Sequence, residues 1–198
     1  MEAVSFFDKY VKTVQRTETI KYTGKVTAVK GLMIESKGPH SVMGEICRIE
    51  IAGGEYSILA EVVGLEDTVV RLMVYGDTKG IEVGDLVVAS GHVLEVPVGP
   101  ELLGRVIDAT GKAYDGKGDL AAEDFYPAIA SPPNPMERMP VKKRIVTGVR
   151  AIDGLLTVGK GQRIGIFAGS GVGKSTLIST IARNTNADVN VIGLIGER

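Results

Sequence analysis

The sequence predicts a small all-β barrel or sandwich followed by the first part of an α/β domain. Short apolar and β-branched runs, separated by glycines, fill residues 20–97. Five of the eight prolines lie in a connector at 127–140. After it, the sequence predicts an apolar strand at 163–168, a glycine-rich loop at 168–176, a helix at 177–184 and a second apolar strand at 188–196. We therefore expect a leader helix at 1–19, a β domain at 20–97 and a partial α/β domain at 98–198.

The composition is typical of a globular protein. Of the 198 residues, 44% are apolar and 24% are charged, and no stretch reaches the roughly 18 apolar residues of a membrane span. The N-terminus lacks the apolar core and cleavage site of a secretory signal. Residues 1–100 carry 10 Lys and Arg against 14 Asp and Glu, which is a poor surface for nucleic acid phosphates. We expect no nucleic acid partner and no membrane-spanning segment.

The leader carries an apolar stripe at helical spacing, with charged residues between its members. Such a stripe can be bound by a partner protein or can pack on the chain's own domain, and the sequence leaves both possibilities open. The stripe consists of Phe6, Phe7, Tyr10, Val11 and Val14.

The β domain shows strand runs but no ligand chemistry. Gly53-Gly54 lies between two runs and predicts a hairpin with a two-residue turn. Cys47, the only cysteine, lies in an apolar run and is expected to be a small buried side chain. His40 and His92 lack the spacing of metal ligands and are expected at the surface or in turns. The predicted strands are 25–29, 32–34, 45–51, 56–63, 68–74 and 86–96.

The connector at 127–140 is expected to be stiff and extended. Proline fixes φ and restricts the residue before it, so this segment is neither a helix nor a central strand. The charge run that follows, Lys142-Lys143-Arg144, is expected to be a solvated surface.

The segment AGSGVGKST at 168–176 has the residue types of a phosphate-binding loop. Its three glycines let backbone N–H groups turn inward, and the helix that follows adds N-terminal donors. Lys174 would reach the β- and γ-phosphates, Ser175 would be a ligand of Mg²⁺, and Thr176 would reach the α-phosphate. We therefore expect ATP and Mg²⁺ as ligands. The predicted nucleotide-binding residues are Ala168, Gly169, Ser170, Gly171, Val172, Gly173, Lys174, Ser175 and Thr176.

The loop departs from the common pattern at its first position, where Ala168 replaces glycine. Alanine is tolerated there if its φ is negative. The spacing also excludes a dinucleotide-binding loop, because the order is G-x-G-x-G-K and not G-x-G-x-x-G.

Glu197 ends the second apolar run, at the sheet edge to which the first run would deliver the loop. A carboxylate there could orient or deprotonate the water that attacks the γ-phosphorus. The residue pattern alone also allows a solvated carboxylate or a pair with Arg198.

The stretches VTGVRAIDGLLTVGKGQRIGIFAGSGVGKST and DVNVIGLIGER closely resemble the flagellar export ATPase of type III secretion, a relative of the catalytic subunit of rotary F- and V-type ATPases. The resemblance extends upstream through VPVGPELLGRVIDATGKAYDGKGDL and GKVTAVKGLMIESKGP, and it covers the chain from about Ile20. It implies an N-terminal β-barrel and a RecA-like P-loop α/β domain in a homohexameric ring. It also implies that Lys174 and Glu197 are catalytic and that Ser175 binds Mg²⁺.

The resemblance further implies partners and a location. The partners would be a regulator or stator-like protein on the leader, a central stalk protein, the export gate and complexes of export substrates with chaperones. The location would be cytoplasmic and peripheral, at the inner face of the bacterial cytoplasmic membrane.

The run VNVIGLIG is apolar at both alternations, so we expect a strand buried on both faces, which one helix cannot cover. We therefore expect an N-terminal fragment of a longer protein, one that hydrolyses ATP poorly or not at all by itself. Two other functions stay open. One is the catalytic subunit of a rotary proton-translocating ATPase, which Ala168 and the run DGLLTVGKGQR argue against. The other is a non-catalytic assembly module.

Overall fold

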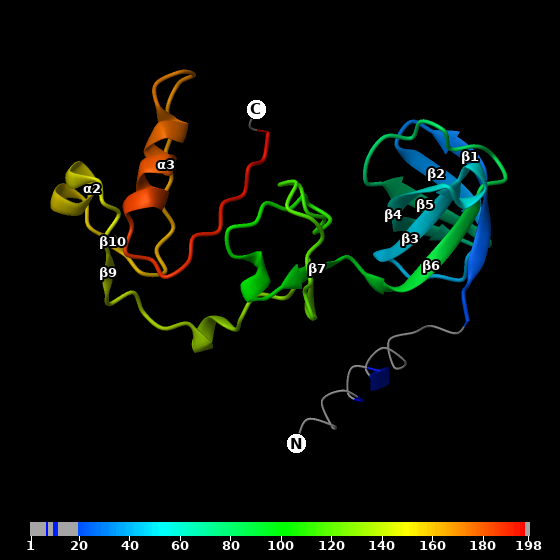
Figure 1. The fold of residues 1–198 in the computed structure, drawn as a ribbon, viewed down its shortest axis with the longest axis horizontal. Coiled ribbons are helices and arrows are strands. Elements are labelled where there is room, and N and C mark those ends of the chain that lie inside the picture. Colours follow the sequence, from blue (N-terminus) through cyan, green and yellow to red (C-terminus); the bar gives the residue numbers. More distant parts are fainter. Residues whose placement is uncertain (1–6, 8–9, 12–19, 197–198) are drawn as a thin grey trace. The chain divides into compact units, whose positions relative to one another are not determined.

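The computed structural model describes residues 7, 10, 11 and 20–196 (Figure 1). The chain divides into two compact units, one ending at Ser131 and one beginning at Pro132, and each is described by itself. Most of the predicted leader helix lies outside the described residues. The three described leader residues, Phe7, Tyr10 and Val11, are helical and exposed. Within the described part of the chain, no helix is both long and apolar enough to cross a membrane.

The first unit contains a closed antiparallel barrel, as the sequence predicts (Figure 1). The strands are paired in the order β1-β2-β5-β4-β3-β6, and β6 closes the barrel by pairing with β1. Each strand coincides with one of the predicted apolar runs, and its ends differ from those of the run by at most a few residues. The strands are β1 (Thr23–Lys30), β2 (Met33–Lys37), β3 (Glu45–Ile51), β4 (Tyr56–Glu66), β5 (Val69–Val74) and β6 (Leu86–Val93).

The barrel encloses the apolar core, because successive side chains of a strand point to opposite faces. Ile34, Ile49 and Leu72 are fully buried, and so is Cys47, as expected for a small apolar side chain. At the mouth of the barrel, Gly24 lies so close to Gly38 that an added Cβ would come within 2.2 Å of its carbonyl group. Only glycine fits at that crossing.

The connection between β3 and β4 is longer than predicted. The ladder ends at the pair Ile51–Tyr56, so four residues form the turn instead of two, and three of them form the short helix η1 (Ala52–Gly54). Gly53 and Gly54 both have positive φ, at 72° and 100°. The glycines therefore mark the hairpin correctly, but a turn of three consecutive residues with positive φ, from Ala52 to Gly54, sets its length.

The predicted strand 86–96 is two strands. β6 ends at Val93, and β7 (Glu95–Val98) pairs with β8 (Asp124–Pro127) in a separate two-stranded sheet. Because β7 and β8 pair, the residues between them, including η2 (Pro100–Leu102), belong to the first compact unit together with the barrel. The compact units thus divide after Ser131, whereas the sequence interpretation divided the domains after residue 97.

Between β7 and β8, one ion pair organises a loop-rich segment. The guanidinium of Arg105 donates from Nε to Asp115 Oδ2 at 2.7 Å and from Nη2 to Oδ1 at 3.1 Å. Asp115 also accepts from the backbone N–H groups of Val106 and Lys117. Arg105 Nη2 also donates to the carbonyl of Gly118 at 2.6 Å, which links Arg105 to the part of the segment after Asp115. Apart from one isolated bridge, this segment has no strand pairing, so polar side chains fix its shape.

The second unit contains two helices, α2 (Arg150–Leu155) and α3 (Lys174–Asn184), and a two-stranded ladder (Figure 1). The ladder joins β9 (Arg144–Ile145) to β10 (Val158–Gly159). In the preceding connector, Pro127 ends β8, and residues 128–140 are irregular except for η3 (Pro135–Glu137), in agreement with their prolines.

The two runs predicted as strands on either side of α3, 163–168 and 188–196, are not strands among the described residues. A strand needs a neighbour to supply ladder hydrogen bonds, and neither run has a neighbouring strand here. Their apolar side chains are accordingly exposed, with Phe167 at 95%, Val191 at 94% and Ile195 at 95%. These runs have the composition of buried strands, but no neighbouring strand that the structure describes pairs with them and their apolar side chains are not covered.

Candidate functional site

The candidate site is the loop between Gln162 and α3. Gly171 and Gly173 have φ of 76° and 95°, values that side chains with a Cβ rarely adopt. An added Cβ at either glycine would meet no atom within 4 Å, so packing does not require glycine here. The requirement comes from the backbone, which turns sharply into the first residue of α3, Lys174. Ala168 does not have positive φ, as its tolerance at the first loop position requires.

The loop curves around an open hollow of about 400 Å³. Seven of the nine predicted nucleotide-binding residues line it together; Ala168 and Val172 belong to the loop but are not among the lining residues. The lining residues are Gly169, Ser170, Gly171, Gly173, Lys174, Ser175 and Thr176.

The electrostatics of the hollow favour an anion. The N-terminus of α3 opens onto it, and the first turn of that helix contains no acidic residue. Helix N-termini present unpaired N–H groups and a positive dipole end to a bound phosphate. Lys174 adds a full positive charge at the same point, and Ser175 and Thr176 add hydroxyl groups. This donor set suits a polyphosphate, and an oxygen ligand such as Ser175 suits Mg²⁺.

A second group of contacts fastens the far end of α3. The backbone N–H of Val146 donates to Asn186 Oδ1 at 2.9 Å, and its carbonyl accepts from the N–H of Asn186 at 3.1 Å and from Thr185 Oγ1 at 2.9 Å. Two residues further on, Gly148 has no room for a Cβ, which would lie 2.2 Å from Asn184 Cβ. The C-terminal end of α3 is thereby held against residues 146–148.

Residues 146–148 are themselves held by Asp153 in α2. The carboxylate accepts from Thr147 N–H at 2.8 Å, from Thr147 Oγ1 at 2.8 Å and from Gly148 N–H at 2.9 Å. The hydrogen bond from the Thr147 amide is the main cause that lowers the pKa of Asp153. From the sequence, Asn184 and Asn186 are expected only to end the helix, and Asp153 is not singled out; its only signal is the Thr-Gly pair that ends five residues before it.

Glu197, the predicted catalytic carboxylate, lies outside the described residues, as does Arg198. The geometry above therefore concerns the phosphate-binding half of the predicted site. In the part of the chain that is described, no group of three or more His, Cys, Asp or Glu side chains is arranged to hold a metal ion.

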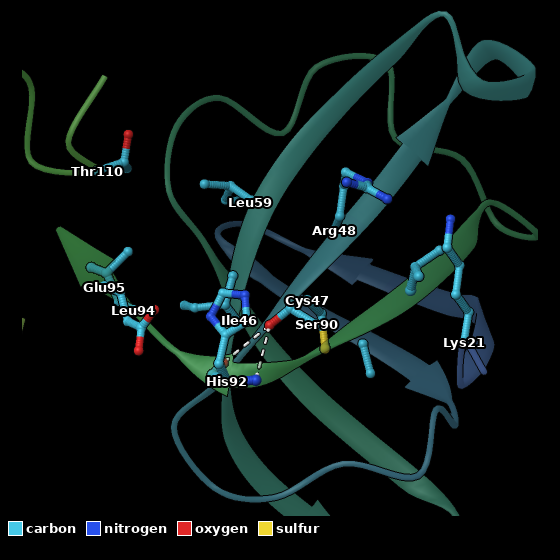
Figure 2. Close-up of a pocket in the computed structure, with 12 residues that line it drawn as sticks. Lys21, Ile46, Cys47, Arg48, Leu59, Ser90, His92, Leu94, Glu95 and Thr110 are labelled. Carbon is cyan, nitrogen blue, oxygen red and sulfur yellow. Dashed lines mark hydrogen bonds between the residues drawn. The ribbon is translucent and has the colours of Figure 1, made fainter. Parts of the chain in front are cut away.

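A second hollow, of about 510 Å³, lies on the barrel beside β3 and β6 (Figure 2). Its lining includes Arg48, Ser90, His92 and Glu95, and Ser90 Oγ donates to the carbonyl of His92 at 3.0 Å. Cys47 also borders it, but burial and the charge of Glu45 raise the pKa of the thiol to about 12. A thiol that stays protonated at neutral pH is a poor nucleophile, so nothing indicates covalent chemistry at this hollow.

Both parts of the chain match models of one protein family. Residues 26–91 match the beta-barrel domain of the ATP synthase alpha/beta family, and residues 148–198 match its nucleotide-binding domain. The first match runs from within β1 to within β6 and so covers most of the barrel, and the second includes the whole loop and α3.

Individual relatives are more specific. A flagellum-specific ATP synthase of Treponema pallidum is 57% identical over 190 residues, which are 96% of this chain and 42% of that protein. One of Bacillus subtilis is 51% identical over 95% of this chain and 43% of its own length. A type 3 secretion system ATPase of Xanthomonas euvesicatoria is 46% identical over 88% of this chain and 40% of its own length.

The chain thus spans less than half the length of these relatives. Along the chain, the match to the beta-barrel domain precedes the match to the nucleotide-binding domain. From the architecture, the loop geometry and these similarities together, the chain belongs to the ATP synthase alpha/beta family.

Proposed function

We propose that this chain is the N-terminal part of an ATPase that drives protein export in a flagellar type III secretion apparatus. The observation that carries the proposal is the loop at 168–176, in which glycine backbone, lysine and hydroxyl groups line one hollow at a helix N-terminus. The identity of 57% to a flagellum-specific ATP synthase supports the flagellar assignment.

In this proposal the loop binds the triphosphate of ATP. The backbone N–H groups of 169–174 and the ammonium of Lys174 stabilise the negative charge of the β- and γ-phosphates. The hydroxyl of Ser175 is a ligand of Mg²⁺, which would neutralise charge on the same phosphates when bound. Glu197 acts on the attacking water as the catalytic carboxylate.

The proposal extends to the assembly. The protein acts as a homohexameric ring in the cytoplasm, peripheral to the inner face of the cytoplasmic membrane, and releases export substrates from their chaperones. Its partners are a stator-like regulator on the leader, a central stalk protein and the export gate. The apolar run within 188–196 would need cover on both faces if it formed a strand, and residues 132–196 as described do not supply that cover.

A rotary proton-translocating ATPase is the second candidate, because the matching family models are named for the ATP synthase alpha/beta subunits. Export and proton translocation differ in their partners. Co-purification with a membrane proton-channel ring would favour the rotary enzyme, whereas restored secretion in a strain that lacks its export ATPase would favour export.

The ATPase assignment is tested with two substitutions in the intact protein. Lys174→Ala removes a charged hydrogen-bond donor, so ATP affinity should fall by about a hundredfold. Glu197→Gln should still bind ATP, but its kcat should fall by about 10²- to 10⁴-fold. Binding is measured with a fluorescent ATP analogue and turnover by phosphate release.

The matched control is Lys160→Ala, which removes an exposed lysine of the same unit outside the loop and should change neither quantity. Unchanged ATP binding by Lys174→Ala would refute the role of the loop, and normal turnover by Glu197→Gln would refute the role of that carboxylate.

A further inference from the structure

The phosphate-binding loop is bounded on both sides by contacts to two short segments of the second unit, which pair with each other in the β9–β10 ladder. On the entry side, Gln162 is tied to Gly159 by reciprocal hydrogen bonds, from Gly159 N–H to Gln162 Oε1 at 2.9 Å and from Gln162 N–H to the Gly159 carbonyl at 3.1 Å. On the exit side, the end of α3 is tied to Val146 by Thr185 and Asn186. The ladder of β9 with β10 connects these two anchoring points.

At this contact, both the backbone N–H and the carbonyl of Val146 are hydrogen-bonded. Asn186 binds it twice, with its side-chain oxygen at 2.9 Å and its own N–H at 3.1 Å, and Thr185 Oγ1 binds the same carbonyl. Gly148 then places its backbone directly against Asn184, where an added Cβ would lie 2.8 Å from the carbonyl oxygen. These contacts fix both the axial position and the lateral position of the helix end.

α3 transmits this position to the loop. A helix of 11 residues is about 16 Å long and is stiff, because each turn is hydrogen-bonded to the next. Its first residue is Lys174, and the loop glycines precede it immediately. A shift or tilt at Asn186 therefore moves the ammonium of Lys174 and the N–H groups that face the hollow.

We propose that Asn186 is a positioning residue for ATP hydrolysis, which sets the place of the phosphate-binding loop by anchoring the C-terminal end of α3 to Val146. This inference rests on the proposed ATPase function. Binding of the phosphates depends mainly on the local shape of the loop, which the anchor leaves unchanged. Turnover also depends on where the bound γ-phosphate lies relative to the rest of the catalytic site, and the anchor determines that place.

The first test is Asn186→Ala in the intact protein. A displacement of about 1 Å far from the chemistry can cost up to about a hundredfold in rate, so kcat should fall at least about tenfold. The dissociation constant for Mg-ATP should change less than about threefold, because the loop and the helix N-terminus remain. The stoichiometry of bound nucleotide should remain that of the wild type.

Stoichiometry separates positioning from simple destabilisation. If the substitution only unfolded part of the sample, bound nucleotide and kcat would fall in the same proportion, and the proposal would be overturned. Asn186→Asp keeps an oxygen acceptor for Val146 N–H and should recover most of the wild-type kcat. A rate for Asn186→Asp no higher than that for Asn186→Ala would equally contradict the proposal.

Asn134 provides a matched control. Its side-chain oxygen also accepts a backbone N–H, that of Met136 at 3.0 Å, but it lies in the connector and not against α3. Asn134→Ala should leave kcat and nucleotide affinity unchanged. Lys174→Ala separates failure of the proposed ATPase function from failure of the proposed role of Asn186. If Lys174→Ala leaves ATP binding unchanged, the proposed function is refuted. If Lys174→Ala is defective in ATP binding and Asn186→Ala has a normal kcat, only the role of Asn186 is refuted.

Discussion

Asp115 shows how one side chain can organise a segment without regular secondary structure. Only 7% of its side chain and 14% of that of Arg105 are exposed, so this ion pair is shielded from water more than most surface pairs. The carboxylate also accepts two backbone N–H groups. These hydrogen bonds stabilise the charged form, and the one from Arg105 is the main cause that lowers the pKa of Asp115.

The lowered pKa makes stability depend on pH. A carboxyl whose folded pKa lies below its unfolded value of about 3.9 binds protons more tightly in the unfolded chain. Its contribution is therefore complete above about pH 5 and is lost progressively as the pH falls through and below 4. We expect Asp115→Asn to lower the urea midpoint of the first unit at pH 7, and to lower it less at pH 3, where the unfolded carboxyl is largely protonated and the folded one is still ionised. Urea titrations followed by far-UV circular dichroism at both pH values measure this difference; an equal loss at pH 3 and pH 7 would contradict it.

At the scale of the element, strand β3 is paired on both sides within the closed barrel and also contributes a side chain to its core. It pairs with β4 on one side and β6 on the other, and Ile49 in its middle is completely buried. Truncating such a residue removes apolar contacts and leaves a cavity that the closed barrel can fill only in part.

We therefore expect Ile49→Ala to lower the free energy of unfolding of the barrel by about 2–5 kcal/mol. The matched control is Leu32→Ala, a truncation in the β1–β2 turn where 59% of the side chain is exposed, and it should change stability by less than about 0.5 kcal/mol. Chemical denaturation of both variants makes the comparison, and losses of similar size would show that Ile49 does not belong to the cooperative core.

The elements also show what the sequence predicts well. All six barrel strands fall on predicted runs, because the alternation of apolar residues and the positive-φ glycines between them are local signals. The hollow formed by the loop at 168–176 follows from the same kind of local signal, since its glycines and Lys174 act within a few residues of one another; that it binds a nucleotide stays a prediction.

The remaining features depend on contacts between distant residues. Asn186 meets Val146 across 40 positions, and nothing in the immediate neighbourhood of either residue indicates the pair. The runs at 163–168 and 188–196 fail as strands for the opposite reason: their local pattern is strong, but a ladder needs a partner strand, and none pairs with them among the described residues. The length of the β3–β4 turn, four residues instead of two, likewise depends on the strands that it joins.

For the molecule as a whole, the two units differ in how their apolar side chains are covered. The fully buried side chains named above all belong to the barrel, whereas Phe167, Val191 and Ile195 in the second unit are almost fully exposed. Segments with few ladder hydrogen bonds and little buried apolar surface open at low free-energy cost.

Hydrogen exchange on residues 1–198 should therefore show two classes of amide. The paired amides of β1–β6 should exchange only with unfolding of the barrel, while those of 164–168 and 189–195 should exchange close to the rate of an unfolded chain. Mass spectrometry of peptides from both regions measures the rates, and the helical amides of α3 serve as an internal reference. Equal protection of 189–195 and β3 would show that the second unit is packed far more tightly than its exposed side chains indicate.

The contiguity of the barrel has a consequence for how the protein is made. Every strand of the closed sheet lies between Thr23 and Val93, so the barrel needs no residue of the second unit to complete its pairing. At about 5–20 residues per second, a ribosome takes several seconds to add the roughly 100 residues that lie between Val93 and residue 198. Small antiparallel barrels fold in about milliseconds to seconds. The nascent chain should thus carry a finished barrel before the phosphate-binding loop leaves the ribosome, and the exposed apolar runs would emerge attached to a folded domain.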